Sequence, residues 1–388
     1  MRPTCYEVSM TDPSLEIAAQ EGVAAFQKSD FPAAILAFEK VTSAENASAH
    51  SWLVLSQCYA ATGDLAREDA ALDTVLAMEP RNVLALIRKG EGMAQRGDDR
   101  AAVSYFNLAL SNAPVDSSPG IARSLERAAA ASAAASGRFA AHLEQSLDAA
   151  GFAAGQRPAL FDEAIGIMTG RMPVQVQQPT SFFYPGLPQT SFYDPGAFPW
   201  VAALEAAAPA IRAELVALLD ERDGFHPYVE GDADRPNRGH ALLDDRRWSA
   251  FDLYRSGKPV KDNVRRCPAT MRALAGAPLP LIPGRSPMAL FSLLEPRTHI
   301  PPHWGMLNTR LICHLPLIVP PTCRLRVGNH QRTVEPGRMM IFDDSIEHEA
   351  WNDSDKVRVV LLFEIWRPEI SERERAALTA MFAAVGDF

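Results

Sequence analysis

The chain has 388 residues, and this length predicts more than one domain, because single hydrophobic cores rarely grow beyond about 250–300 residues. A formal net charge of −9 and the lack of any lysine or arginine run argue against a general nucleic-acid binder. The five cysteines are scattered without a CxxC pair, which is typical of free thiols in a reducing compartment. The start, MRPTCYEVSM, lacks a signal-peptide pattern and no apolar run could span a bilayer, so we expect a cytoplasmic protein with no membrane partner.

A repeat with a period of 34 residues occupies the first third of the chain. The aspartates Asp30, Asp64 and Asp98 follow one another at this interval. A small residue, an aromatic residue or leucine, and a residue that ends the unit recur in the same register: Gly22, Ser56 and Gly90; Phe38, Leu72 and Phe106; Asn46, Pro80 and Pro114. The pattern resembles the tetratricopeptide repeat and predicts stacked helix pairs over residues 1–115. Their concave face could bind a protein partner, or the helices could only pad or dimerise the rest of the chain.

The next two segments differ in composition from the repeats. Residues 116–168 are rich in alanine, serine and glutamate at helical spacing, and we expect them to form capping helices. Residues 169–198 are rich in proline and aromatic residues, a composition that interrupts helices and strands and marks a linker.

Beyond residue 225 the chain changes to short β-rich runs separated by turns. Segments such as MALFSLLEP, RLICHLPLIVP and VRVVLLFEIW follow one another closely, which is typical of a β-sandwich or barrel. We therefore expect residues 199–388 to form a jelly roll with flanking helices, the last one after a capping box of Ser371 and Glu374. The predicted class is α + β multidomain, with an α-helical array followed by a jelly roll.

The β-rich half contains five histidines that are candidate metal ligands, and four acidic residues near the last of them. They are His299, His303, His314, His330 and His348, with Asp343, Asp344, Glu347 and Glu349. Two imidazoles from different strands, with carboxylates nearby and no thiol pair, suit Fe(II) or another borderline divalent ion. A single histidine beside a strand is more often structural, so residue type alone does not choose among the five.

The order of residues around two of these histidines resembles a known family. The runs PPHWGMLNTRLICHLPLIVPPTCRLRVGN and GRMMIFDDSIEHEAWNDSDKVRVVLLFEIWRPE resemble the aspartyl/asparaginyl β-hydroxylase family of Fe(II)- and 2-oxoglutarate-dependent dioxygenases. The resemblance covers residues 180–370 and implies a double-stranded β-helix in which His303 and His348 hold the iron. Asp343 and Asp344 would then orient His348 or cap the turn before it.

The resemblance also implies a set of residues for the cosubstrates, 2-oxoglutarate and O2. Arg358 matches the arginine that pairs with the distal carboxylate of 2-oxoglutarate, and an arginine in so apolar a strand would be costly without an anion. Ser292 matches a serine that helps to hold the cosubstrate, and His314 matches a histidine near its other end. Ser292 could instead be a turn hydroxyl.

Three positions depart from the pattern. Gly305 stands where most of the wider superfamily has a metal-binding acid, so water would fill that coordination position. Ile312 and Leu243 stand where vertebrate members have arginines, so the resemblance does not carry the vertebrate substrate over unchanged. Arg310 remains a candidate to grip a substrate anion, and the alternative is a surface salt-bridge arginine.

The predicted function is an Fe(II)- and 2-oxoglutarate-dependent hydroxylase that β-hydroxylates an aspartate or asparagine residue of a peptide or protein. Two alternatives remain open. One is hydroxylation of a small amino acid or a lipid acyl group. The other is a non-catalytic tetratricopeptide-repeat adaptor with a degenerate jelly roll.

Overall fold

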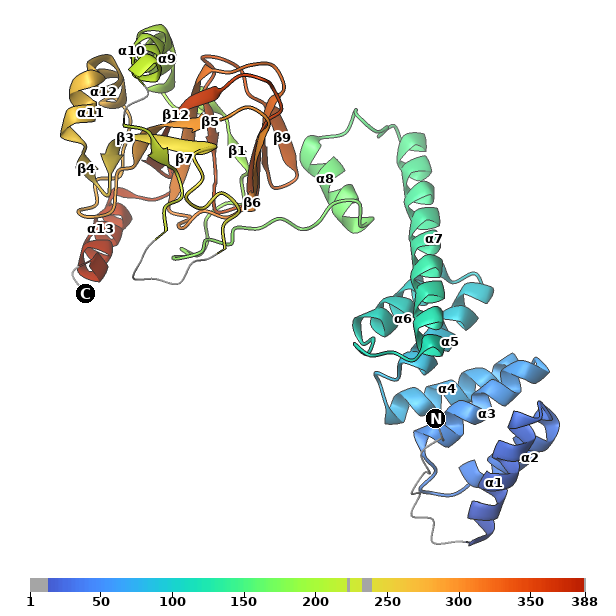
Figure 1. The fold of residues 1–388 in the computed structure, drawn as a ribbon. Coiled ribbons are helices and arrows are strands. Elements are labelled where there is room, and N and C mark those ends of the chain that lie inside the picture. The colour runs from blue at the N-terminus through green and yellow to red at the C-terminus, as the bar shows by residue number, and fades with distance from the viewer. Residues whose placement is uncertain (1–12, 222–223, 232–238, 387–388) are drawn as a thin grey trace. The chain divides into compact units, whose positions relative to one another are not determined.

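The computed structural model describes residues 13–221, 224–231 and 239–386 (Figure 1). The chain divides into two compact units, Met1–Arg171 and Met172–Phe388. The first unit is helical, and the second contains all the β-sheet of the described residues (Figure 1). None of the helices in these ranges is long and apolar enough to cross a bilayer.

Three helix pairs form most of the first unit. They are α1 (Pro13–Gln27) with α2 (Phe31–Thr42), α3 (Ala49–Thr62) with α4 (Leu65–Met78), and α5 (Val83–Gln95) with α6 (Asp99–Ser111). The repeated aspartates Asp30, Asp64 and Asp98 are the N-caps of the second helix in each pair, and each carboxylate accepts a hydrogen bond from the backbone N–H three residues later. The predicted helical array is confirmed.

The small residues of the repeat lie where the paired helices touch. A Cβ atom on Gly90 would lie 2.5 Å from Cε1 of Phe106, and one on Gly22 would lie 3.0 Å from Cε2 of Phe38. Each aromatic ring therefore packs directly on the backbone of the preceding helix. Two further helices, α7 (Pro119–Ala149) and α8 (Ala159–Met168), follow the repeats, and Ala128 of α7 packs into the core formed by α5 and α6.

Two antiparallel sheets form the second unit. The larger has the order β1-β10-β7-β12-β5-β3-β2, with β4 paired to β3, and the smaller has the order β6-β11-β8-β9. The strands are β1 (Phe192–Tyr193), β2 (His226–Pro227), β3 (Trp248–Arg255), β4 (Lys258–Pro259), β5 (Ala289–Leu294), β6 (Thr298–His303), β7 (Arg310–Ile318), β8 (Cys323–Val327), β9 (His330–Thr333), β10 (Met340–Phe342), β11 (His348–Asn352) and β12 (Arg358–Trp366). This two-sheet arrangement is the predicted jelly roll.

The two faces of the larger sheet are covered by different elements: helices cover one face, and the smaller sheet covers the other. Helices α9 (Val201–Ala206), α10 (Ala208–Glu221), α11 (Lys261–Arg266) and α12 (Pro268–Leu274) lie beside one face (Figure 1), and a last helix is α13 (Glu372–Gly386). On β7, Leu311 and Cys313 belong to the core shared with α9, α10 and α12, whereas Ile312 belongs to the core shared with the smaller sheet. Because side chains alternate along a strand, His314 shares the inner face with Ile312.

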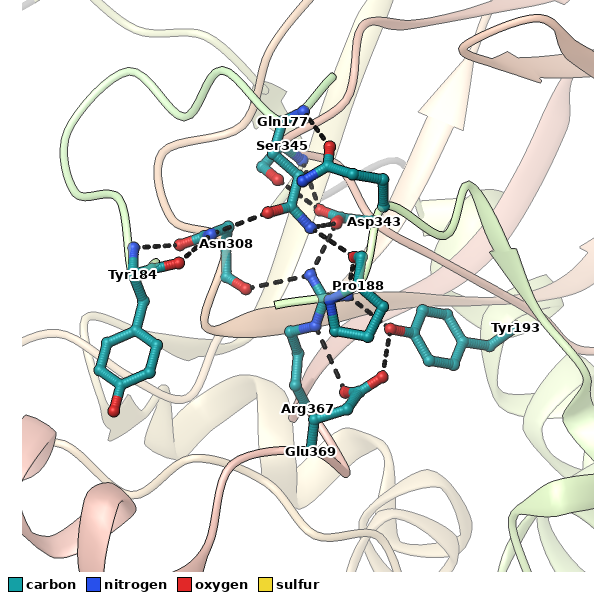
Figure 2. Close-up of polar contacts among 10 residues, drawn as sticks. Gln177, Tyr184, Pro188, Tyr193, Asn308, Asp343, Ser345, Arg367 and Glu369 are labelled. Carbon is teal, nitrogen blue, oxygen red and sulfur yellow. Dashed lines mark hydrogen bonds and ion pairs between the residues drawn. The ribbon is translucent and has the colours of Figure 1, made fainter. Parts of the chain in front are cut away.

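A segment before β1 runs along the jelly roll and is hydrogen-bonded to two of its turns. The N–H of Gln178 donates to the carbonyl of Ser345 at 2.7 Å, and the N–H of Thr180 donates to the carbonyl of Gly305 at 2.9 Å. Figure 2 shows the buried polar network beside it, in which Asp343 meets Arg367 at 2.7 Å. Part of the stretch that the sequence marks as a linker thus belongs to the packed second unit.

Candidate active site

His303 and His348 face each other across neighbouring strands. They are direct partners in the antiparallel pairing of β6 with β11. Their ring centroids lie 4.1 Å apart with an angle of 50° between the planes. The strand register thus brings together two histidines that are far apart in the sequence.

Both rings are held in the same way by backbone carbonyls. Nδ1 of His303 lies 2.8 Å from the carbonyl oxygen of Pro301, and Nδ1 of His348 lies 3.1 Å from that of Ile346. With the ring neutral, Nδ1–H donates to the carbonyl and the lone pair of Nε2 stays available for a metal. Burial lowers the pKa of His303 to about 3 and that of His348 to about 4, so both rings are neutral at pH 7.

The four carboxylates that surround His348 in the sequence are all held by arginines. Asp343 pairs with Arg367, Asp344 with Arg310, and both Glu347 and Glu349 with Arg326. Asp343 also accepts a hydrogen bond from the N–H of Ser345, as expected for a residue that caps the turn. The carbonyl of Ile346, rather than one of these carboxylates, fixes the His348 ring.

Gly305 has no room for a side chain. A Cβ atom at this position would lie 2.1 Å from Oδ2 of Asp344, and the N–H of Gly305 donates to the carbonyl of Asp344 at 2.6 Å. In the part of the chain that the structure describes, no group of three or more His, Cys, Asp or Glu side chains is arranged to hold a metal. A metal site made of two histidines and no protein carboxylate contains only two such side chains, so it is not one of these groups.

Arg358 is a buried cation with no ion pair among the residues that the structure describes. It begins β12, is 1% exposed, and its Nε and Nη2 atoms have no hydrogen-bond partner within these residues. Burial lowers its pKa to about 10, which leaves the guanidinium charged at pH 7. Such a group costs free energy unless an anion meets it, so its surroundings fit a bound carboxylate.

Two further residues of the predicted cosubstrate site share the inner face with Arg358. Oγ of Ser292 accepts a hydrogen bond from Nε1 of Trp248 at 3.1 Å, which leaves the hydroxyl proton free to donate. Nδ1 of His314 is buried and has no hydrogen-bond partner in the described ranges, and the ring lies edge-on to Phe342 with centroids 4.9 Å apart. Burial lowers the pKa of His314 well below its ordinary value, so this ring too is neutral.

One cavity of about 890 Å³ connects these side chains. Its volume lies within the range of roughly 300–1,000 Å³ that is usual for small-molecule sites. Six predicted site residues line it: Ser292, His303, Arg310, His314, His348 and Arg358. A cavity that joins a pair of neutral imidazoles to an unpaired guanidinium can take a metal ion together with an organic acid.

Two of the candidate histidines lie elsewhere. His299 stacks on Trp351 with centroids 4.9 Å apart and pairs with Glu349 at 2.8 Å, and it does not line the cavity. His330 begins β9 and does not line the cavity either.

Sequence reasoning missed several cavity residues. The ring of His240 lies 5.9 Å from that of His303, and Tyr228 stacks on Trp248 with centroids 3.9 Å apart. Trp304 also lines the cavity, and its buried Nε1 has no partner among the residues described. Neither His240 nor Tyr228 lies in a regular strand pattern, and their approach to β6 and β3 depends on loops.

Comparison with known proteins gives relatives for the second unit. The family model described as aspartyl/asparaginyl beta-hydroxylase matches residues 205–368. The ornithine lipid ester-linked acyl 2-hydroxylase of Rhizobium tropici is 38% identical over 188 residues, which cover 48% of this chain and 63% of that protein. The human aspartyl/asparaginyl beta-hydroxylase is 32% identical over 182 residues, which cover 47% of this chain and 23% of that protein. The chain therefore spans less than two thirds of either relative.

Among solved structures, the chain is similar to the Yersinia enterocolitica type III secretion chaperone SycD in complex with a peptide of the translocator YopD. The match has a TM-score of 0.31 and 16% identity, and it covers 34% of this chain and 99% of that chain.

Proposed function

We propose that the C-terminal unit of this chain belongs to the aspartyl/asparaginyl β-hydroxylase family and that the chain is an Fe(II)- and 2-oxoglutarate-dependent hydroxylase. One observation carries the proposal. Two neutral imidazoles with available Nε2 atoms line the same cavity as a buried, charged Arg358 that meets no anion in the described part of the chain.

Three residues of the cavity have the main tasks in this proposal. His303 and His348 hold the metal through Nε2, while the carbonyls of Pro301 and Ile346 keep the rings in the right tautomer. Arg358 pairs with the distal carboxylate of 2-oxoglutarate. When bound, Fe(II) and 2-oxoglutarate supply the chemistry by which O2 converts a C–H bond to C–OH, with succinate and CO2 as coproducts.

Ser292 and His314 complete the cosubstrate site. The free proton of the Ser292 hydroxyl can be donated to a carboxylate, because Trp248 already occupies its oxygen as a donor. Nδ1 of His314, which has no partner among the described residues, could donate to the other carboxylate of the cosubstrate. Apolar residues around these groups exclude water and strengthen each charge-assisted hydrogen bond.

For the substrate, we propose hydroxylation at the β-carbon of an aspartate or asparagine residue in a peptide or protein. The second candidate is the acyl chain of a lipid, because the rhizobial acyl 2-hydroxylase is 38% identical and the human enzyme 32%. The concave face of the helical repeats would bind a protein partner.

Metal binding tests the proposal directly. Apo protein is titrated anaerobically with Fe(II) and, in parallel, with Mn(II), and affinity is measured by calorimetry. The variant His303→Ala should bind either ion at least tenfold more weakly, whereas His299→Ala, on a histidine outside the cavity, should bind as the wild type does. Unchanged affinity in His303→Ala would exclude this site.

Catalysis needs a separate readout. Wild-type protein with Fe(II), 2-oxoglutarate and O2 should form succinate, and peptide or lipid substrates should gain the mass of one oxygen atom. A protein that binds Fe(II) but forms no succinate with any peptide or lipid mixture would instead be a non-catalytic adaptor.

A further inference from the structure

Arg310 is enclosed by two carboxylates. Its Nη1 contacts Oε2 of Glu364, and its Nη2 lies 3.2 Å from Oδ2 of Asp344. The side chains of Glu364 and Asp344 are 0% and 8% exposed, and that of Arg310 is 14% exposed. With one cation between two anions, this trio carries a net charge of −1 when all three groups are ionised.

The trio lies beside the proposed iron ligands. Asp344 contacts the position of Gly305, two residues after His303. Arg310, Asp344 and His348 all line the one cavity. The group of a substrate that reacts at the metal therefore approaches an arginine that is already paired with two carboxylates.

The other arginines that line the cavity have contacts or tasks of their own. Among the described lining residues, the remaining arginines are Arg255, Arg285 and Arg358. Arg255 pairs with Glu230 and lies 3.7 Å from Asp252.

Arg358 is assigned to the cosubstrate, and Arg285 lies over the ring of Phe382, 4.7 Å from its centroid. Ile312, which also lines the cavity, contributes only apolar surface.

We propose that the substrate presents an uncharged carbonyl group, a carboxamide or an ester, beside the iron ligands, and that the Arg310–Asp344–Glu364 trio rejects a carboxylate there. This inference rests on the proposed function and narrows its substrate. It favours an asparagine over an aspartate side chain, and an ester-linked acyl chain over a free fatty acid. It also replaces the sequence-based expectation that Arg310 grips a substrate anion.

The physical reason is the balance between desolvation and pairing. A carboxylate that enters the cavity loses its water and meets an arginine whose charge two acids already compensate. An uncharged carbonyl loses less on desolvation and can accept a hydrogen bond from Nε1 of Trp304 or Nε of Arg310, two buried atoms with no partner in the part of the chain that the structure describes. The site thus discriminates against an anion because the two carboxylates of the trio repel a third one.

Matched pairs of probes test the inference on the full chain loaded with Mn(II) and 2-oxoglutarate under argon. The first pair is two peptides of one sequence that differ only in asparagine or aspartate at the centre. The second is a long-chain fatty acid and its methyl ester in detergent micelles. Calorimetry should give at least tenfold tighter binding of the uncharged member, and the pair that binds identifies the source. Equal or tighter binding of a carboxylate member overturns the inference.

Stability supplies a measurement that needs no substrate. Arg310→Met leaves two buried carboxylates unpaired and should lower the folding equilibrium constant by about 100-fold or more. Adding Asp344→Asn and Glu364→Gln to this variant should restore most of the loss. Arg285→Met, which breaks no ion pair recorded in the described residues, should change the constant by less than about fivefold. If Arg310→Met is as stable as the wild type, the two carboxylates do not compensate the charge of Arg310. This result would overturn the inference even if no probe binds.

A third variant separates this inference from the proposed function. Glu364→Gln keeps the hydrogen bond that Glu364 accepts from the N–H of Met288 but removes one negative charge beside Arg310. It should narrow the preference for uncharged probes at least threefold, and an unchanged preference would contradict the inference. Failure of the proposed function would appear elsewhere, as the absence of metal binding and succinate formation in the wild type.

Discussion

Gly305 and Asp344 are so close that a Cβ atom on the glycine would lie 2.1 Å from Oδ2 of the aspartate. Gly305→Ala should therefore lower the free energy of unfolding by about 1–3 kcal/mol, the usual cost of overpacking. Urea denaturation measures the change. In the background of Asp344→Ala the same substitution should cost less, and equal costs in both backgrounds would contradict the predicted contact.

The buried guanidinium of Arg358 predicts opposite effects on binding and stability. Arg358→Met should weaken 2-oxoglutarate binding by roughly 100-fold, because loss of one partner of a buried charge pair typically costs about 2–5 kcal/mol. Without 2-oxoglutarate, the variant should be at least as stable as the wild type, since an unpaired buried cation is removed. Calorimetry and thermal unfolding check the two effects, and intact 2-oxoglutarate affinity would refute the assignment.

The ion pair of Arg367 and Asp343 should be far more important for stability than a surface pair. Both side chains are 0% exposed, so Arg367→Met leaves a buried carboxylate and should cost about 3–5 kcal/mol (Figure 2). The matched control is Arg297→Met, which breaks an exposed pair with Asp355 and should cost less than about 1 kcal/mol. Similar losses in the two variants would argue against the buried network.

Two glycines of the helical unit should respond in opposite directions to alanine. Gly90→Ala drives a methyl group into Phe106 and should destabilise the unit by about 1–3 kcal/mol. Gly137→Ala, on an exposed position of α7 where a Cβ atom would meet nothing within 4 Å, should stabilise it by about 0.5–1 kcal/mol. Thermal unfolding of the two variants provides the comparison, and destabilisation by both would contradict it.

The buried cysteines should be inert in the folded protein. Burial raises the pKa of Cys58 to about 11 and that of Cys267 to about 12, so both thiols stay protonated at pH 8. Their contribution to stability is present below the ordinary thiol pKa of about 8.5 and is lost as the pH rises through the two raised values. Iodoacetamide at pH 8 followed by mass spectrometry should leave both unmodified until denaturant is added. Rapid labelling of either would contradict their burial.

The helical array could be predicted from sequence because its signals are local. An aspartate N-cap and a glycine that meets an aromatic ring recur once in each unit, and each acts within one helix pair. The jelly roll was predictable from the short β-rich runs, and the resemblance singled out His303 and His348. Only the structure shows that these two residues are cross-strand partners.

The charge state of the site could not be predicted because its partners are distant in sequence. Arg310 meets Glu364 and Asp344 only after β7, β10 and β12 pair in one sheet. In the sequence Arg310 therefore looks available for an anion. The acidic residues near His348 also look available in the sequence, for example to orient the His348 ring. In the structure, arginines elsewhere in the chain hold all of them.

The segment before β1 ties together the loop that follows His303 and the loop that precedes His348. Its backbone donates to Gly305 and Met306 after one histidine and to Ser345 before the other. A recombinant fragment that began at residue 199 would lack the donors of these hydrogen bonds, whereas one that began at residue 172 would retain them. The shortest fragment able to load iron should accordingly start before Gln177, well upstream of the first strand.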